Sequence, residues 1–294
     1  MRVAICHTKN APNANRCLEA AYNGVGECGD TPVKITQANA HKIYGCEAMI
    51  QMCEYNKVAG KDFRWWLKRV SNKKLIPRLI MDTGYIRNGR LKGSPDFHDR
   101  YMACSWQSIK GLGVSLNKNS PPDRWDKLGV SLKPWRKPKG SSQRILVLGQ
   151  HETGTSTQHI NVIDWFQEVI AELPRYTRRP IVMRKHPNQT EFPEGDYRIL
   201  KDGFTIEEDL RDTWCVIART TNGAVDAIMN GIPVITPDDM SMAYPVSAHD
   251  LCEVEDPYMP DRTQWGYDIA YAQWKITEIG YGTMWQHMGK GVMR

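Results

Sequence analysis

Two short apolar runs in the second half of the chain end in residues that can bind an anion. Residues 181–183 lead into a basic turn, and residues 214–218 lead into a hydroxyl-rich turn that opens a helix. Such runs fit buried parallel strands, whose carboxyl ends bind ligands in open α/β sheets. Cationic side chains, hydroxyls and the first N–H groups of a helix all suit phosphate. The residues at these turns are Arg184, Lys185, His186, Thr220, Thr221, Asn222 and Gly223.

The hydroxyl-rich turn does not identify a site alone, because ordinary helix capping also uses Thr and Asn at that position. The basic turn supplies the second observation. Three cationic or ionisable residues in a row at a strand end are costly to bury unless an anion meets them. Because both turns end strands of one predicted sheet, we expect them to face the same phosphate group.

A third strand end offers similar groups. Residues 145–148 form an apolar run followed by a loop rich in glycine and hydroxyls, residues 149–157. Backbone N–H groups and short hydroxyls can approach a phosphate or a sugar closely. The loop contains neither the Gly-Lys-Ser/Thr ending of a Walker loop nor the spaced glycines of a dinucleotide site. We expect Gln150 and Thr155 to contact the same ligand.

These segments resemble the nucleotide-sugar half of a GT-B glycosyltransferase. The resemblance rests on residues 184–187 (Arg-Lys-His-Pro), 220–223 (Thr-Thr-Asn-Gly) and 230–234 (Asn-Gly-Ile-Pro-Val). It is strongest toward the capsule polysaccharide and sialyltransferase-like transferases, in which a His-Pro motif and a Ser/Thr pair hold the donor phosphates. It implies an α/β chain of two Rossmann-like domains with a cleft between them, and a C-terminal helix that returns to the first domain. The acidic-acidic-glycine motif of such enzymes is missing.

The expected domains are residues 1–140, 141–265 and 266–294. A Pro- and Lys-rich stretch, residues 133–142, has the composition of a linker and places the first boundary. Residues 41–58 and 267–288 are both predicted to be helical, the latter being the returning helix. A resemblance to phage DNA glycosyltransferases is a further hypothesis, which rests on the basic first half of the chain.

Charge is unevenly distributed along the chain. The 294 residues carry a net charge of +6, yet residues 1–143 contain 25 Lys and Arg against 11 Asp and Glu, a net charge of +14. The remainder is therefore at −8. A basic half indicates a polyanionic partner; the alternative is a solvated basic face with no partner.

A basic stretch with interleaved tryptophans, residues 61–70, is the candidate contact for that partner. Cations meet phosphates and aromatic rings stack on bases in nucleic-acid complexes. The same pattern also describes a helix whose Trp side is core. The predicted acceptor-binding residues are Arg64, Lys68, Arg69 and Arg87.

Asp82 ends the apolar run 79–81 and is the candidate general base. A carboxylate at a strand end of the first domain can accept the proton of an acceptor hydroxyl. The alternative is a turn aspartate before Thr83-Gly84. His7, Asp30 and Asp99 are weaker candidates, and His186 is the second predicted catalytic residue.

Composition excludes several classes of protein. No apolar run reaches the length of a membrane span, and the N-terminus is too soon polar for a signal peptide. The eight cysteines include no Cys-x-x-Cys pair, so we expect reduced thiols, a cytoplasmic protein (host cytoplasm if phage-encoded) and no metal or zinc site. Asp238-Asp239 is interpreted as a loop feature.

Together these features predict a metal-independent glycosyltransferase that uses a UDP- or CMP-type nucleotide sugar and no other cofactor. The basic half favours double-stranded DNA as partner, with a hydroxymethylated pyrimidine as acceptor, as in phage DNA glucosyltransferases. The family resemblance favours a polysaccharide or lipid-linked saccharide at a membrane surface. Two further alternatives are a non-enzymatic nucleic-acid-binding protein on a transferase scaffold and a sugar-nucleotide epimerase.

Overall fold

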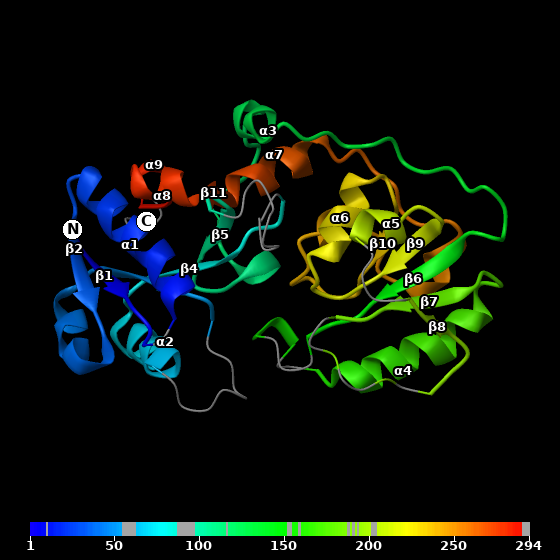
Figure 1. Ribbon diagram of the computed structural model, residues 1–294, viewed down its shortest axis with the longest axis horizontal. Helices are drawn as coiled ribbons and strands as arrows, with labels where there is room; N and C mark the ends of the chain where they lie inside the picture. Colours follow the sequence, from blue (N-terminus) through cyan, green and yellow to red (C-terminus); the bar gives the residue numbers. More distant parts are fainter. Residues whose placement is uncertain are drawn as a thin grey trace. The chain divides into compact units, whose positions relative to one another are not determined.

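The chain forms two compact units, each with one sheet (Figure 1). The first unit is Met1–Arg124 with Asp268–Arg294, and the second is Trp125–Tyr267. The computed structural model describes residues 1–9, 11–54, 63–86, 98–115, 117–151, 155–157, 160–186, 189, 192, 194–200 and 205–289. Among the helices in those ranges, none has the length and apolar character needed to span a bilayer.

The sheet of the first unit has the order β11-β5-β4-β3-β1-β2. Strands β4, β3, β1 and β2 are mutually parallel, whereas β5 runs antiparallel to both of its neighbours. The order reverses beside β1, so the carboxyl ends of β1 and β3 flank a topological switch point. The strands are β1 (Arg2–Cys6), β2 (Thr31–Ile35), β3 (Ala48–Met52), β4 (Arg78–Thr83), β5 (Tyr101–Trp106) and β11 (Gln273–Lys275).

Helices cover both faces of this sheet. Helices α1 (Pro12–Glu27), α8 (Ile276–Gly280) and α9 (Thr283–Met288) share one core with the strands, in which Trp106, Trp274 and Trp285 are buried. On the other face, α2 (Phe63–Lys74) and the 3-10 helix η1 (Gln37–Gly45) pack through Ile43, Leu67 and Val70.

The predicted helix at residues 41–58 is wrong. Residues 37–45 form η1, and Ala48–Met52 is strand β3, buried along its whole length between β1 and β4. A five-residue apolar run does not distinguish a buried strand from a helix segment by periodicity. Pairing on both sides decides for the strand here.

The chain returns to the first unit at its C-terminal end, but not as one long helix. Strand β11 interrupts it, and Gly282, at φ +80°, separates α8 from α9. The side chain of Gln273 explains the strand: its Oε1 accepts hydrogen bonds from the backbone N–H of Tyr85 and Ile86, at 2.8 and 2.9 Å. Its Nε2 donates to the carbonyl of Ile86 at 3.0 Å. These fixed partners hold Gln273 on the edge of β5.

The sheet of the second unit is parallel throughout, in the order β10-β9-β6-β7-β8. Trp165, Phe166 and Trp214 dominate the core beneath it. The strands are β6 (Arg144–Leu148), β7 (Ile181–Arg184), β8 (Arg198–Ile199), β9 (Thr213–Ile217) and β10 (Val234–Ile235). The α-helices are α4 (Val162–Glu172), α5 (Ile206–Asp209), α6 (Gly223–Met229), with α3 (Asp123–Leu128) and α7 (Thr263–Tyr271) at the two passages between the units.

The stretch at residues 133–142 is not a free linker, and the division after residue 124 differs from the expected boundary at 140. Backbone N–H groups of Lys133 and Arg136 donate to the carbonyls of Met229 and Gly231, at 3.0 and 2.7 Å. The Arg262 guanidinium lies 3.7 Å from the Trp135 ring centroid. Residues 133–142, here called the strap, therefore form backbone hydrogen bonds to other residues of the second unit.

Candidate functional site

Three strand ends of the second unit carry the predicted donor-binding residues. Strand β6 lies between β7 and β9 and is parallel to both. The turn after β6, the basic turn after β7 and the hydroxyl-rich turn after β9 therefore leave the sheet at the same edge. This arrangement follows from the register, in which Leu148 is opposite Arg184 and Val147 is opposite Ile217.

Gly149 lets the turns after β6 and β7 approach closely. Its N–H donates to the carbonyl of Arg184 at 2.8 Å. A Cβ at this position would lie 2.2 Å from Gln189 Oε1 and 2.6 Å from the backbone N of His186. Only glycine therefore fits at position 149. Because glycine has no side chain, His186 can lie beside the start of the loop that contains Gln150.

A buried polar cluster joins the turns after β6 and β9. The Thr220 hydroxyl donates to Ser156 Oγ at 2.9 Å and lies 3.4 Å from Gln150 Oε1. Gln150 is 3% exposed, and its Nε2 has no hydrogen-bond partner among the residues that the structure describes. An unpaired buried amide donor costs about 1–3 kcal/mol. A ligand that brings an acceptor oxygen here would recover that energy.

Two histidines meet at the same edge. The rings of His151 and His186 have their centroids 5.3 Å apart. Thr157 donates its hydroxyl to the His151 carbonyl at 2.7 Å and so fixes the loop. His151 was not among the predicted residues, although its position three residues after β6, next to the strand that leads to His186, is a signal in the sequence. Two half-buried imidazoles can stabilise an anion more strongly than one.

Arg184 is paired within the protein. Its Nη1 forms an ion pair with Asp209 Oδ2 and donates to the Thr205 carbonyl at 3.4 Å. Asp209 is buried, so much of the charge of Arg184 is compensated in this structure. Binding of a donor phosphate by Arg184 and its neighbour Lys185 stays a prediction.

A second carboxyl lies near Arg184. Burial, with a smaller contribution from the charge of Glu207, raises the pKa of Asp226 to about 7, and Arg184 opposes this shift. Asp226 belongs to α6 and was not predicted from the sequence, because an acidic residue in the first turn of a helix is common. It titrates near neutral pH beside the predicted site.

The hydroxyl-rich turn opens a short helix. Helix α6 has seven residues, and the side chain of Asn222 makes no capping hydrogen bond. Thr221 Oγ1 accepts from the N–H of Gly223 at 3.4 Å. So few aligned peptide groups give a weaker field than the roughly half a positive charge at the N-terminus of a long helix. A Cβ on Gly223 would lie 2.9 Å from Leu148 Cδ1, so close packing requires this glycine. Thr155 begins the 3-10 helix η3 (Thr155–Thr157) in the loop after β6.

Arg219 and Asp238 form a partly buried ion pair that the sequence interpretation missed. Arg219 donates to Asp238 Oδ2 from both Nε and Nη2, at 3.1 and 3.0 Å. Asp238 Oδ1 also accepts from the backbone N–H of Met240 at 3.0 Å. Asp238 is therefore a structural partner of the residue preceding Thr220. No group of three or more potential metal ligands occurs among the residues that the structure describes.

In the first unit, Asp82 and Cys53 lie at adjacent strand ends. Asp82 Oδ1 accepts from the backbone N–H of Thr83 at 2.7 Å and lies 3.9 Å from Cys53 Sγ. Cys53 has φ +56°, a conformation that a non-glycine residue adopts only when its surroundings impose it. Burial is the main cause that raises the pKa of the Cys53 thiol to about 12, and the negative charge of Asp82 acts in the same direction. The nearby charge of Arg64 opposes this shift.

His7 follows β1, on the other side of the switch point. It is 6% exposed, and its Nδ1 lies 3.8 Å from Glu19 Oε1. Within the described part of the chain, its Nε2 has no hydrogen-bond partner. Burial lowers the pKa of His7, as does Lys34, whereas Glu19 raises it. His7 thus lies at the strand edge that also carries Asp82, with a pKa below its ordinary value, mainly because it is buried.

The two remaining candidates for the base have structural partners. Asp30 binds the N-terminal ammonium of Met1 and the indole N–H of Trp285, both at 2.8 Å. Asp99 accepts from the backbone N–H and the hydroxyl of Thr277, both at 2.9 Å. These bonds tie the C-terminal segment to the first unit, which explains both carboxylates without catalysis.

The predicted acceptor-binding residues lie on α2, except Arg87, which is outside the described residues. Arg64 is in the first turn, near Cys53. Lys68 Nζ lies 3.6 Å from Glu54 Oε1, which also binds Arg78 at 2.7 Å. Arg69 is exposed and its guanidinium lies 4.6 Å from the Trp65 ring centroid.

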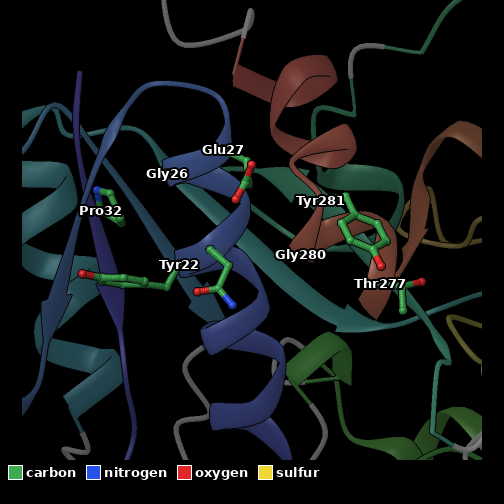
Figure 2. A pocket seen from close by; sticks show the side chains of 8 residues that line it. Tyr22, Gly26, Glu27, Pro32, Thr277, Gly280 and Tyr281 are labelled. Carbon is green, nitrogen blue, oxygen red and sulfur yellow. The ribbon is translucent and has the colours of Figure 1, made fainter.

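A separate hollow of about 540 Å³ lies against α1 and α8 (Figure 2). Tyr22 and Tyr281 stand on either side of α1 in this view. Glu27 is its only charged lining residue, and none of the predicted site residues lines it.

Solved structures with the same fold are known. The chain resembles the β-Kdo 2,4-transferase of Thermosulfurimonas dismutans KpsC with a TM-score of 0.56 and 12% sequence identity, over 92% of this chain and 90% of that one. For the β-Kdo 2,7-transferase of the same KpsC, the TM-score is 0.51 and the identity 11%, over 97% of this chain and 98% of that one. The chain has the GT-B fold. No protein-family model matches the sequence, and neither does any curated protein.

The GT-B fold confirms the predicted fold class. The second unit contains the segments that resemble the nucleotide-sugar half of GT-B glycosyltransferases. The cluster of Gln150, Ser156 and Thr220 and the His151–His186 pair occupy the carboxyl edge of that half. At 11–12% identity the likeness establishes the fold, and the chemistry has to be argued from the residues.

Proposed function

We propose that the protein is a glycosyltransferase that binds a nucleotide sugar on its second unit. The observation that carries the proposal is the buried cluster of Gln150, Ser156 and Thr220, with an unpaired amide donor, beside His186. Fixed hydrogen-bond donors at the carboxyl edge of a parallel sheet suit a phosphate-containing ligand. The ligand that we propose is a UDP- or CMP-type nucleotide sugar.

The proposed reaction transfers the sugar to a hydroxyl group. The acceptor oxygen attacks the anomeric carbon, the bond from that carbon to the phosphate oxygen breaks, and the electron pair stays on the phosphate. Asp82 takes the acceptor proton. His186, with His151 beside it, and the Gln150 amide stabilise the charge on the leaving phosphate. Removing one donor of this kind typically costs about 3–4 kcal/mol of transition-state stabilisation.

The uneven distribution of charge between the two units favours DNA as the acceptor, with a hydroxymethylated pyrimidine as the acceptor base. Counted over the structural units, the first unit carries a net charge of about +11 and the second about −5. A phosphodiester polymer is the partner that this asymmetry suits. A base in duplex DNA would have to leave the stack to reach Asp82.

A second candidate acceptor is an anionic saccharide. The observation in its favour is the fold similarity to two domains whose names describe Kdo transfer. A basic first unit would also attract an acidic glycan or an anionic membrane surface. Under this alternative the donor site is unchanged, and only the acceptor differs.

The test combines donor binding with product analysis. We expect UDP or CMP, or one of the corresponding nucleotide sugars, to raise the melting temperature of the wild type and not that of Gln150→Glu, which places a carboxylate against the phosphate. Gln143→Glu, another buried glutamine, is the matched control. Oligonucleotides with 5-hydroxymethyl pyrimidines are then incubated with the protein and with the nucleotide sugar that raised its melting temperature. Their nucleosides are analysed by mass spectrometry.

The outcomes separate the proposals. A glycosylated nucleoside formed by the wild type and lost in Asp82→Asn supports DNA as acceptor. Transfer to a Kdo-containing oligosaccharide alone supports the saccharide. Absence of nucleotide binding, with intact DNA binding, contradicts the transferase and leaves a nucleic-acid-binding protein. Epimerised free nucleotide sugar in place of a transfer product would show the epimerase.

A further inference from the structure

The outer face of α2 carries a groove that the proposed chemistry does not use. The groove has a volume of about 610 Å³ and lies between α2 and η1. Among the residues that the structure describes, its lining combines aromatic rings with cations and includes no carboxylate. The lining residues are Tyr44, Trp65, Trp66, Arg69, Val70, Asn72, Lys73 and Lys74.

Cations and rings alternate along this groove. The Arg69 guanidinium lies 4.6 Å from the Trp65 ring centroid, and Lys74 Nζ lies 5.7 Å from that of Tyr44. Arg69, Lys73 and Lys74 are exposed, and Tyr44 is 56% exposed. The rings stay accessible beside charges of one sign, in contrast to the hollow at α1, whose tyrosines accompany Glu27 (Figure 2).

The two neighbouring tryptophans of α2 make different contacts. Trp66 stacks on Phe63 at 5.6 Å, and both pack against the core formed with Leu67 and Val70. Trp65 is not part of that cluster. Trp66 therefore fits the alternative of a core tryptophan, whereas Trp65 lies against the Arg69 guanidinium.

The length and charge of the helix match a nucleic-acid strand. Ten residues separate Arg64 from Lys74, which corresponds to roughly 15 Å along the helix axis. Each DNA strand presents a phosphate about every 3.4 Å along the duplex, so this distance covers about four phosphates. Exposed aromatic rings between the cations can stack on unpaired bases, as in proteins that bind single strands.

A membrane surface fits this face less well. Helices that lie in a bilayer interface segregate an apolar face, which enters the lipid, from a cationic face. The apolar face of α2, with Leu67 and Val70, is already buried in the protein. What remains exposed mixes rings and cations.

We propose that this groove binds the DNA strand next to the acceptor nucleotide, with Lys73 and Lys74 on phosphates and Trp65 stacked on a base. The inference rests on the proposed function for the identity of the polymer. It assigns strand binding to Tyr44, Trp65, Lys73 and Lys74 in addition to Arg69.

The experiment measures DNA affinity by fluorescence anisotropy, with labelled single-stranded and duplex oligonucleotides at salt concentrations from about 50 to 200 mM. Lys73→Gln with Lys74→Gln should weaken binding at least about tenfold at low salt and reduce the slope of log affinity against log salt by roughly 2. Lys9→Gln with Lys118→Gln, which removes the same charge from two exposed lysines elsewhere in the first unit, is the control. It should change neither quantity appreciably.

The stacking role is tested with Trp65→Ala. We expect affinity to fall by about 5- to 100-fold with an unchanged salt slope, because stacking involves no counterion release. Tyr281→Ala, at an exposed aromatic residue of the other hollow, is the control. Circular dichroism and thermal melting of each variant show whether it is folded.

Equal losses in the test and control lysine variants would overturn the assignment, as would a Trp65→Ala variant with wild-type affinity. If the protein sediments with anionic phospholipid vesicles and binds no DNA, the partner is a membrane surface, and the assignment of the groove to DNA is overturned. Nucleotide binding to the second unit is measured in parallel. If nucleotides bind and sugar is transferred while the groove variants bind DNA normally, the groove assignment fails alone; if nucleotides do not bind, the proposed function fails.

Discussion

The Thr220 hydroxyl donates to Ser156 Oγ across 2.9 Å, and both side chains are at least nine-tenths buried. This bond ties the turn after β9 to the loop after β6 through side chains, whereas Gly149 ties the loop after β6 to the turn after β7 through backbone. The three turns are thus held together before any ligand binds. Such preorganisation is what a phosphate site needs if its donors are to be in place when charge develops.

Replacing Thr220 with valine removes the hydroxyl and keeps the shape. We expect nucleotide affinity to fall about tenfold or more, and the free energy of unfolding to fall by about 1–3 kcal/mol, because Ser156 and Gln150 lose a buried partner. Isothermal titration calorimetry and urea unfolding measure the two effects. Thr213→Val, at the other end of β9, removes a buried hydroxyl that donates to the Asp209 carbonyl at 2.9 Å. This control should lose stability and keep nucleotide affinity; a loss of affinity in both variants would show a general effect on the sheet.

The paired imidazoles predict coupled effects on turnover. His186→Ala should lower kcat by about 10²–10³, the usual cost of removing one group that stabilises a developing charge. His151→Ala should have a smaller effect, and the double variant should lose less than the product of the single losses, because the rings are in contact. Steady-state kinetics of all three variants form the cycle. Since both side chains are partly exposed, melting temperatures should stay near that of the wild type. Unchanged turnover in His186→Ala would remove this residue from the site.

The sequence alone located three strands of the second unit because they are continuous apolar runs. Residues 145–148, 182–183 and 214–217 are buried on both faces, so their composition predicts parallel strands without reference to tertiary contacts. The polar turns then follow at the carboxyl edge by topology. The contact between His151 and His186 depends on the close approach that Gly149 permits, which is a property of the register and not of composition.

Elements defined by distant partners were harder to predict. Gln273–Lys275 lies in a sequence with helical character, and it becomes a strand because β5 offers an open edge and Gln273 satisfies two backbone N–H groups of residues 85–86. The strap at residues 133–142 looked like a linker because no local pattern shows that its amides bind the turn after α6. Charge patterns located α2, but only the structure separates Trp65 from the core tryptophan beside it.

The pKa of Asp226, near 7, predicts a pH-dependent stability. The carboxyl loses its proton near pH 4 in the unfolded chain and near pH 7 in the folded protein, so between these values the folded state holds a proton that the unfolded state has lost. The contribution of Asp226 to stability therefore falls as pH rises from about 4 to 7. Asp226→Asn removes this dependence and should be more stable than the wild type at pH 8, on the order of 1–3 kcal/mol.

Urea unfolding of wild type and Asp226→Asn from pH 5 to 8 measures the difference. The gap between the two proteins should widen with pH and level off above the pKa of Asp226. Arg184 partly stabilises the carboxylate, which keeps the gap below the full value for an isolated buried acid. A gap that is constant across this range would place the titration of Asp226 outside it.

Two glycines of α1 test the packing of the C-terminal segment on the first unit. A Cβ on Gly24 would lie 1.9 Å from the carbonyl oxygen of Ile279 and 3.0 Å from the N of Gly282, whereas the nearest atom to a Cβ on Gly26 is Pro32 Cγ at 3.9 Å. Gly24→Ala should lower the free energy of unfolding by about 1–3 kcal/mol, because backbone cannot move aside as a flexible side chain can. Gly26→Ala should raise it by roughly 0.5–1 kcal/mol, since alanine is the better helix former. Urea unfolding measures both, and the near-ultraviolet circular dichroism of Trp285 and its neighbours reports whether the segment repacks. Equal stability of the two variants would mean that α8 does not cross α1 at Gly24, and the tie between the C-terminal segment and the first sheet would have to be sought at Asp30 and Asp99 instead.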